Sequence, residues 1–318
     1  MTTVNVRQVI PRDAIPSIDD PEFATAYIGE DDDLVIVLES SPPRAYPLCI
    51  LDFHEVVNDE VDGDPIAVTW CPLCGSAVVY DRVVDGRTHT FGVSGKLADD
   101  DLVLYDRETE SEWKQSLGTC IAGELEGERL AVRPAATVTW QTFRERYPDG
   151  VVLQPTDAES EAASDDDDPA PIDYDDRPYE AYFERDGFGL GAHRGGESRE
   201  WNREDLEPKA VVLGVEHGDE TVGFPLPWVE DAGGHCQTAV DGLEVVVFAT
   251  DAGIHAFEHP GLAFEAGEAD GFEADGTTWD GATGESDDGR RLRRLPARRL
   301  FAFAWQDDHG PDSFVGWR

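Results

Sequence analysis

The sequence predicts a β-rich α+β protein, built from two related β-meander modules with peripheral helices that arose by internal duplication. Three observations favour this fold class. Short apolar runs separated by Asp-Gly turns are typical of β-hairpins. Segments with helical periodicity are few and do not alternate regularly with the strand runs. A series of motifs occurs twice in the same order, which is the signature of a repeat.

Helix signals occur at two places near the N-terminus. The segment Asp19-Asp20-Pro21-Glu22 supplies an N-cap, a proline at the first helical position and an acid in the first turn. A strand is expected at residues 34–39. Apolar residues then recur at helical spacing in residues 47–58, so a short helix is expected to begin at Pro47.

Two Asp-Gly pairs, Asp62-Gly63 and Asp85-Gly86, predict hairpin turns between alternating apolar runs. The strands expected around these turns lie at residues 66–70, 77–82, 88–93 and 102–105. A closing helix is expected at residues 139–147, because Pro148 follows and ends it.

The repeat is recognised from pairs of similar segments in the same order. The pairs are 35–39 with 212–216, 45–48 with 223–226, 70–82 with 247–259, 90–91 with 263–264, Trp113 with Trp279, and 127–134 with 289–296. In this alignment Phe248 stands at the position of Cys71, and Asp251 at that of Cys74. The second copy has therefore lost both cysteines.

The repeat divides the chain into three parts. Residues 1–155 form the intact module, and residues 178–318 form a degenerate second module. Between them, residues 156–177 contain an aspartate run, Asp165 to Asp168, followed by prolines. Like charges and prolines cannot bury enough apolar surface to order themselves, so this stretch is expected to be an exposed linker or long loop.

The composition is strongly acidic. The 318 residues include 68 Asp and Glu against 25 Lys and Arg, with a formal net charge of −43, and only three lysines. Such a charge strains a compact state unless salt screens it, so we expect a cytoplasmic, salt-adapted protein surrounded by solvent cations. The charge excludes nucleic acid as a partner. No apolar run is long enough to insert in a membrane, and Met1 to Arg12 has no signal-peptide core.

The residues most suited to chemistry form the box Trp70-Cys71-Pro72-Leu73-Cys74-Gly75-Ser76. A C-x-x-C pair brings two thiols within reach of one metal ion, or of each other. The chain has five cysteines, an odd and low number that argues against a disulfide framework.

Several long motifs carry a resemblance to a known family. These motifs are Tyr46-Pro47-Leu48, His54 to Asp59, Cys71 to Ser76, Phe91 to Gly95, and Tyr105 to Thr109. In them the chain resembles the uncharacterised bacterial and archaeal family catalogued as domain of unknown function 3179, as a member of haloarchaeal type. The resemblance is strong over residues 12–153 and weaker beyond. It implies no particular activity.

The first interpretation of the Cys box is a metal site. Cys71 and Cys74 resemble a rubredoxin-type knuckle, and His54, from a motif of the same module, is the best third ligand. Asn58 lies four residues further on and is expected to share a helix face with His54 and orient it, with Glu55 also close by. Two thiolates and an imidazole suit zinc or copper.

Two other interpretations stay open. Trp-Cys-x-x-Cys also precedes the active-site helix of thioredoxin-like proteins, although here a strand is expected after Cys74. Alternatively, the pair only stabilises a turn in a non-enzymatic structural or binding protein. No nucleotide cofactor is expected, because the glycines from Gly189 to Gly196 do not form a phosphate loop.

Overall fold

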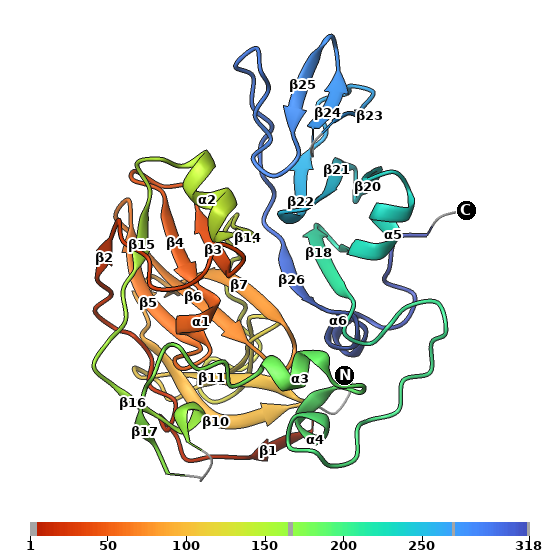
Figure 1. Cartoon of the computed structure of the whole chain (residues 1–318). Helices are drawn as coiled ribbons and strands as arrows, with labels where there is room; N and C mark the ends of the chain where they lie inside the picture. The colour runs from red at the N-terminus through yellow and green to blue at the C-terminus, as the bar shows by residue number, and fades with distance from the viewer. Residues whose placement is uncertain (1–4, 165–167, 269–270, 317–318) are drawn as a thin grey trace.

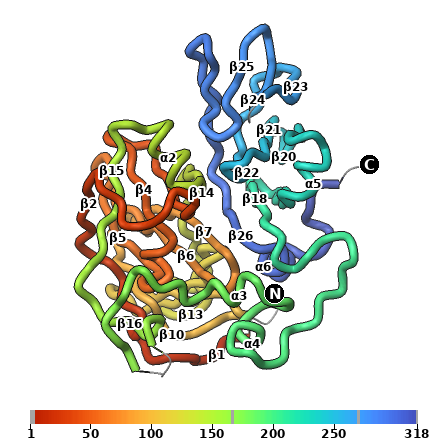
Figure 2. Tube along the Cα trace, viewed as in Figure 1, coloured from red at the N-terminus to blue at the C-terminus, as the bar shows by residue number. Residues whose placement is uncertain are grey.

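The computed structural model describes residues 5–164, 168–268 and 271–316. The chain forms two bodies, with the N-terminal half on the left of Figure 1 and the C-terminal half on the right. Strands dominate both bodies, and the helices are short and peripheral (Figures 1 and 2). The predicted β-rich class is therefore confirmed. Among the described residues, no helix has the length and apolar character needed to span a membrane.

The first sheet has the strand order β14-β3-β4-β15-β2. Its strands are β2 (Phe23–Ala24), β3 (Leu34–Leu38), β4 (Arg44–Pro47), β14 (Ala136–Thr139) and β15 (Val151–Leu153). Helix α1 (Leu48–Leu51) follows β4 directly, and α2 (Trp140–Arg146) follows β14. The Thr139 hydroxyl accepts the backbone N–H of Thr142 and caps α2. The closing helix predicted at residues 139–147 is present as α2.

A six-stranded sheet joins the two halves in the order β19-β18-β26-β7-β6-β5. Its strands are β5 (Val56–Val61), β6 (Asp64–Cys71), β7 (Ser76–Asp81), β18 (Val211–His217), β19 (Glu220–Pro225) and β26 (Arg298–Phe301). Strand β26 pairs with β18 on one side and with β7 on the other. One hydrophobic cluster also contains residues of both halves, among them Val78 and Trp113 with Leu300 and Trp305. The halves therefore share a sheet and a core.

The remaining strands form smaller sheets. A five-stranded sheet contains β1 (Val6–Gln8), β10 (Phe91–Ala98), β11 (Asp101–Asp106), β12 (Glu112–Lys114) and β13 (Thr119–Ala122). In the C-terminal half, β20 (His235–Val240), β21 (Leu243–Thr250) and β22 (Gly253–Glu258) form a meander. A second set of three consists of β23 (Glu265–Ala266), β24 (Gly271–Ala274) and β25 (Thr277–Asp280). Two pairs complete the strands: β8 (Val83–Val84) with β9 (Arg87–Thr88), and β16 (Glu159–Ser160) with β17 (Ala170–Pro171). The other helices are η1 (Glu161–Ala163), α3 (Glu180–Glu184), α4 (Gly189–His193), α5 (Leu226–Asp231) and α6 (Ala302–His309).

The Asp-Gly turns lie where the sequence predicts them. Asp62 and Gly63 join β5 to β6 with φ of 54° and 89°, and Asp85 and Gly86 join β8 to β9 with φ of 49° and 73°. Two successive residues with positive φ give the twist that a tight hairpin needs.

The helix predicted after Asp19 is wrong. Ile18 forms a bridge to Val57 instead, and the Asp19 carboxylate accepts a hydrogen bond from the Asn58 amide at 2.7 Å. The chain then enters β2, where Phe23 packs edge-on against Tyr46. These contacts with distant residues override a capping signal that is purely local.

The helix predicted at residues 47–58 is correct only in its first turn. Pro47 precedes α1, which ends at Leu51. Glu55 adopts a left-handed φ of 58°, and β5 begins at Val56. Val56 and Val57 are β-branched and pair with Thr69 and Val68 of β6, so sheet pairing replaces helix there.

The segment between the halves is partly packed against the N-terminal half. Ser160 is buried, and its hydroxyl donates to the Phe53 carbonyl at 2.8 Å. Tyr174 contacts His54. Asp165 to Asp167, most of the aspartate run, lie outside the described residues.

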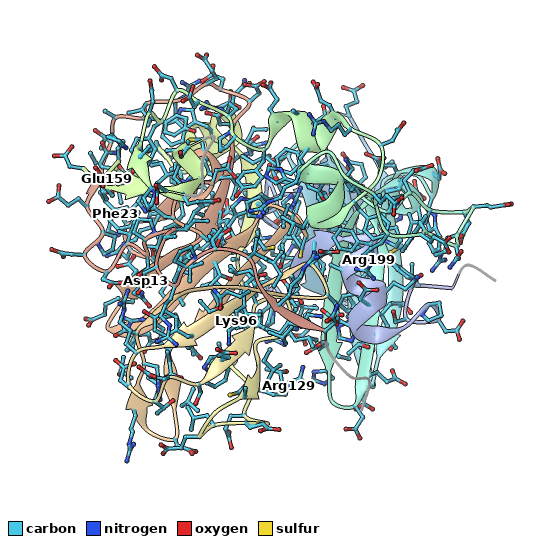
Figure 3. All side chains as sticks on the ribbon, turned by 90° about the horizontal axis from the view of Figure 1, so that it is seen from below. Asp13, Phe23, Lys96, Arg129, Glu159 and Arg199 are labelled. Carbon is cyan, nitrogen blue, oxygen red and sulfur yellow. The ribbon has the colours of Figure 1, made fainter. Side chains whose placement is uncertain are left out.

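Charged side chains project around the whole outline of the molecule when it is seen from below (Figure 3). Most of the 25 basic residues pair with acids, but the 68 acids outnumber them. The surface is therefore a shell of carboxylates with scattered ion pairs.

Candidate metal centre

The two box cysteines lie at the end of the β6–β7 hairpin. Cys71 is the last residue of β6, and it pairs with Ser76 across the loop that contains Cys74. The two Sγ atoms are 3.2 Å apart, and both residues are buried. Gly75 has a φ of 57°, and a Cβ there would meet the Phe301 ring at 2.7 Å. Both the turn and the packing of β26 therefore require glycine at this position.

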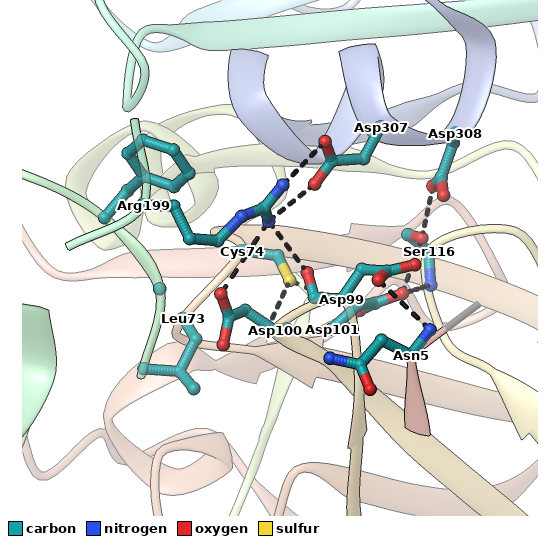
Figure 4. A network of polar contacts seen from close by, with 12 residues as sticks. Asn5, Leu73, Cys74, Asp99, Asp100, Asp101, Ser116, Arg199, Asp307 and Asp308 are labelled. Atoms are coloured by element: carbon teal, nitrogen blue, oxygen red, sulfur yellow. Dashed lines mark hydrogen bonds and ion pairs between the residues drawn. The ribbon is translucent and has the colours of Figure 1, made fainter. Parts of the chain in front are cut away.

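A carboxylate completes a three-residue group. Asp101, the first residue of β11, places its Oδ1 atom 3.3 Å from the Cys74 Sγ atom (Figure 4). One donor atom from each of Cys71, Cys74 and Asp101 lies within 4.8 Å of the other two, and all three residues are buried. Two sulfurs and one oxygen therefore converge on one point.

Polar groups contact the second oxygen of the Asp101 carboxylate, the one that does not face Cys74. Its Oδ2 atom accepts hydrogen bonds from the Ser116 backbone N–H at 3.0 Å and contacts the Ser116 hydroxyl at 2.6 Å. The same hydroxyl lies 2.6 Å from Oδ2 of Asp308 (Figure 4). Asp308 also forms an ion pair with buried Lys114. A hydroxyl has one proton, so it donates to one of these carboxyl groups, and the other must carry a proton to complete the second contact.

Electrostatics keep the two thiols protonated when no cation is present, whereas Asp101 ionises at a lower pH than they do. Burial raises the pKa of Asp101 to about 6. Burial also raises the pKa of both thiols, and the negative charge of Asp101 raises them further. An activated dithiol has the opposite surroundings, because nearby positive charge is what lowers a thiol pKa.

A cavity of about 940 Å³ adjoins the cysteines. Cys71 and Glu55 line it, together with Tyr179 and His193 of residues 178–207, which lead into the C-terminal half. A hydrogen bond connects these residues to the Cys loop: the Tyr182 hydroxyl donates to the Leu73 carbonyl at 2.6 Å. Residues 178–207 therefore form one wall of this cavity.

Glu55 has an unusual setting. It is buried at a left-handed φ of 58°, and its side chain lines the cavity. Burial and the negative charge of Glu161 raise the pKa of Glu55 to about 8. At neutral pH it is therefore mostly a neutral carboxylic acid, which can donate a hydrogen bond into the cavity.

His54 is buried outside the three-residue group that the described residues form. Its Nδ1 atom lies 2.8 Å from the Pro16 carbonyl oxygen, and its Nε2 atom lies 2.7 Å from the Tyr174 hydroxyl. A carbonyl only accepts, so Nδ1 carries the proton and Nε2 accepts from Tyr174. Burial lowers the pKa of His54 to about 4. The role of His54 as a metal ligand stays a prediction, with both ring nitrogens engaged here.

Asn58 does not orient His54 by sharing a helix face, because it lies on β5. Its side-chain amide donates to the Asp19 carboxylate and to the Phe91 carbonyl, each at 2.7 Å. Its Oδ1 atom accepts the Phe91 backbone N–H at 2.9 Å. Asn58 therefore connects β5 to β10 and has a structural role.

A second group of possible ligands consists of His89, Asp106 and Glu108. Asp106 already accepts hydrogen bonds from the Thr109 backbone, the Thr109 hydroxyl and the Trp113 indole. These contacts occupy its oxygens, and its His89 contact, at 3.1 Å, completes a satisfied buried network. The cysteine group, with two thiols beside a buried carboxyl and a cavity next to Cys71, is the better candidate.

The sequence analysis did not identify Asp101. It lies 27 residues after Cys74, in a run with Asp99 and Asp100 that resembles many other acidic runs of this chain. The only local signal was an acid at the start of an apolar strand, and the β10–β11 hairpin that brings it to the cysteines is a property of the fold.

Comparison with protein families gives one finding. A family model matches residues 12–312, which is nearly the whole chain and includes both halves. The chain belongs to this family, described as protein of unknown function (DUF3179). The resemblance inferred from the motifs is confirmed, and it extends well beyond residue 153. Comparisons with curated proteins and with solved structures give no match.

Proposed function

We propose that this member of the DUF3179 family binds a zinc ion through Cys71, Cys74 and Asp101. The observation that carries the proposal is the convergence of two sulfurs and one carboxylate oxygen, all buried, within 4.8 Å of one another. Zinc is bound in proteins by these atom types. Thiolates alone also suit copper, but the carboxylate oxygen favours zinc over the softer Cu(I) ion.

The distance between the two sulfurs allows a zinc ion to bind after small adjustments of the side chains. Tetrahedral zinc–sulfur bonds of about 2.3 Å place two sulfurs about 3.7 Å apart. The sulfurs here are 3.2 Å apart, so the side chains would separate by a few tenths of an ångström. The Ser116, Asp308 and Lys114 network would orient the carboxylate, as groups behind metal ligands commonly do.

The position of the cavity indicates whether a zinc ion here would be of the catalytic or the structural type. Three protein ligands leave one position of a tetrahedral zinc open, and Cys71 faces the 940 Å³ cavity. An open position is typical of catalytic zinc, whereas structural zinc has four protein ligands. We therefore infer that the fourth position takes a water molecule or a small ligand from the cavity.

The competing interpretations are less well supported. A thiol redox site needs a stabilised thiolate, but burial and the negative charge of Asp101 raise the Cys71 pKa. A zinc ion would reverse this electrostatic effect and displace the protons of its ligands. A merely structural thiol pair would not account for a buried carboxylate against one sulfur.

The decisive experiment is the metal content of purified protein after zinc loading and desalting. Wild type should hold one zinc per chain, and Cys71→Ser, Cys74→Ser and Asp101→Asn should each lose most of it. Cys120→Ser and Cys236→Ser are matched controls, because both cysteines are buried away from the group. A His54→Gln variant tests the remaining ligand prediction, and retained zinc there would remove His54 from the site.

Cobalt substitution provides an independent reading. Thiolate ligands give Co²⁺ an intense charge-transfer absorption, which should appear in wild type and vanish in Cys71→Ser. If wild type binds neither metal, the proposal is wrong. Reversible oxidation to a Cys71–Cys74 disulfide would then support the redox interpretation, and inert thiols would support the structural one.

We further propose that the two halves arose by duplication. The support is matching strand register: Val35 faces Pro47 and Val138, and Val212 faces Pro225 and Leu300. In both halves the proline begins a helix, α1 or α5. The other matching contacts are the bridges Tyr80–Val132 and Phe257–Arg294, and the hydrogen bonds from Leu130 to Gly118 and from Leu292 to Gly284, each 2.8 Å.

The register also refines the alignment at the Cys box. Cys71 pairs with Ser76 across four residues, whereas Thr250 pairs with Gly253 across two. Under the duplication, Cys71 corresponds to Thr250, and the loop that carries Cys74 is two residues shorter in the second half. The loss of the metal site is then a loss of the loop itself.

The charge of −43 supports one more inference, that the protein works in a salt-rich cytoplasm of haloarchaeal type. A surface so rich in carboxylates requires screening, and it disfavours polyanionic partners.

A further inference from the structure

Strand β26 and the segment before it contain six arginines, and five of them pair with acids. These pairs are Arg290 with Asp275 and Asp288, Arg291 with Glu39, Arg293 with Glu258, Arg294 with Glu39, and Arg298 with Glu216. Arg299 is the exception: its Nη1 atom donates to the Gly75 carbonyl at 2.7 Å, and it has no ion pair with any described residue. Few basic residues in the described part of this acidic chain lack an ion pair, and Arg299 is one of them.

Arg299 lies between the two halves. It pairs with Leu213 of β18 on one side and with Ala77 of β7 on the other, so the three side chains share one face of the six-stranded sheet. On this face lies a cavity of about 180 Å³, lined by Arg299 and by Leu213, Leu226 and Ile254. Small residues such as Ala77 and Ala252 leave the space open.

The positive charge of the Arg299 guanidinium has no carboxylate partner among the described residues. Burial alone lowers the pKa of Arg299 to about 10, and no carboxylate acts against this effect. A guanidinium has five N–H donors, and one accepting carbonyl leaves most of them to the cavity. The Trp70 ring, 6.0 Å from Cζ, adds only a weak contact. A partly buried guanidinium with one accepting carbonyl gains from pairing with an anion.

We propose that this cavity binds a small aliphatic monocarboxylate, from acetate to butyrate. The carboxylate would form a bidentate pair with Arg299, which matches the planar fork of a guanidinium. The alkyl chain would pack against Leu213, Leu226 and Ile254. A volume of 180 Å³ corresponds to about six waters, which is room for such an anion with little water left.

The rim of the cavity sets the orientation of the ligand. Exposed Asp251, in the β21–β22 turn, also lines the cavity and marks where it reaches the surface. Its negative charge disfavours a second anionic group at that end, so dicarboxylates should bind worse than monocarboxylates. The cavity is distinct from the zinc site, although Arg299 also donates to the Gly75 carbonyl of the Cys loop, so propionate binding and zinc content are measured separately on wild type.

The test replaces sodium gluconate by sodium propionate at constant ionic strength, which separates specific binding from charge screening. Gluconate carries hydroxyl groups that the apolar walls cannot satisfy, so it serves as the inert anion. Propionate should raise the unfolding temperature of wild type saturably. Arg299→Gln should weaken this response at least about tenfold, while Arg293→Gln, at an exposed and paired position, should keep it.

A second measurement uses wild type alone, so that it does not depend on folding of the variant. Saturation transfer from the protein to the methyl protons of propionate should be observed by NMR and be abolished by excess butyrate. The proposal is overturned if propionate gives no saturable effect, if chloride acts equally well, or if Arg299→Gln responds like wild type. Zinc content should be the same with and without propionate.

Discussion

Asp52 is a buried carboxyl group whose nearest partner is neutral. It is 7% exposed, and its Oδ1 atom accepts the Trp70 indole N–H at 2.8 Å. Burial raises the pKa of Asp52 to about 7. The folded protein therefore holds this proton at a pH where the unfolded chain, with an ordinary pKa near 3.9, has released it.

This difference predicts how an Asp52→Asn variant depends on pH. Wild type should lose stability as pH rises from about 4 to about 7, because only the unfolded state ionises there, and the loss should be complete above pH 7. Asparagine stays neutral and still accepts the Trp70 hydrogen bond. The free energy of unfolding of the variant relative to wild type should therefore rise by up to about 4 kcal/mol between pH 4 and pH 8.

Urea unfolding at several pH values, in constant salt, measures this difference. Asp20→Asn is the control, because Asp20 is exposed and the substitution changes the net charge equally. A difference between Asp52→Asn and wild type that does not vary with pH would contradict the assignment of a buried neutral carboxyl group.

At the scale of elements, four glycines form a matched set across the two halves. Gly118 and Gly284 have φ of 62° and 75°, and a Cβ would meet the Tyr80 ring at 2.5 Å or the Phe257 ring at 2.6 Å. Gly127 and Gly289 also have positive φ, of 95° and 89°, but a Cβ there would meet open space.

Alanine substitutions should therefore separate into two pairs. Gly127→Ala and Gly289→Ala should each lower the free energy of unfolding by about 1–2 kcal/mol, because an alanine in the left-handed region is strained. Gly118→Ala and Gly284→Ala should cost about 1–3 kcal/mol more, because the methyl group also displaces a buried ring. Thermal unfolding of the four variants measures the costs. If Gly118 and Gly284 differed greatly from each other, the proposed equivalence of the halves would lose its support at this point.

The same scale shows what the sequence could predict. The hairpins at Asp62-Gly63 and Asp85-Gly86, strand β3 and helix α2 were predictable, because turn residues, apolar alternation and the stop signal of Pro148 act locally. The helix expected after Asp19 failed because the contact of Asp19 with Asn58 is not local. The box cysteines were recognised by spacing, but Asp101 joins them only through the pairing of β10 with β11. His54 was chosen as a ligand because its motif belongs to the same module as the Cys box. In the structure its ring contacts Pro16 and Tyr174.

For the whole molecule, the junction of the halves is the feature with most consequences. Strand β26 closes the shared sheet, its Phe301 N–H donates to the Cys74 carbonyl at 2.7 Å, and its Arg299 holds the Gly75 carbonyl. The C-terminal half, which lacks the cysteines, thus supports the loop that carries them. Two backbone carbonyls of the Cys loop are therefore held by residues of the C-terminal half.

The net charge leads to the last prediction, in which the melting temperature should rise with salt. At −43, carboxylates repel one another across the shell of the molecule, and raising salt from about 0.1 M to 1 M shortens the Debye length from about 10 Å to about 3 Å. Potassium gluconate should therefore raise the unfolding temperature progressively, without the Arg299 cavity contributing. Potassium propionate at equal ionic strength should give the same rise plus a saturable increment that is complete at lower concentration. A melting temperature that stays flat or falls in gluconate would mean that charge repulsion does not limit the stability of this fold.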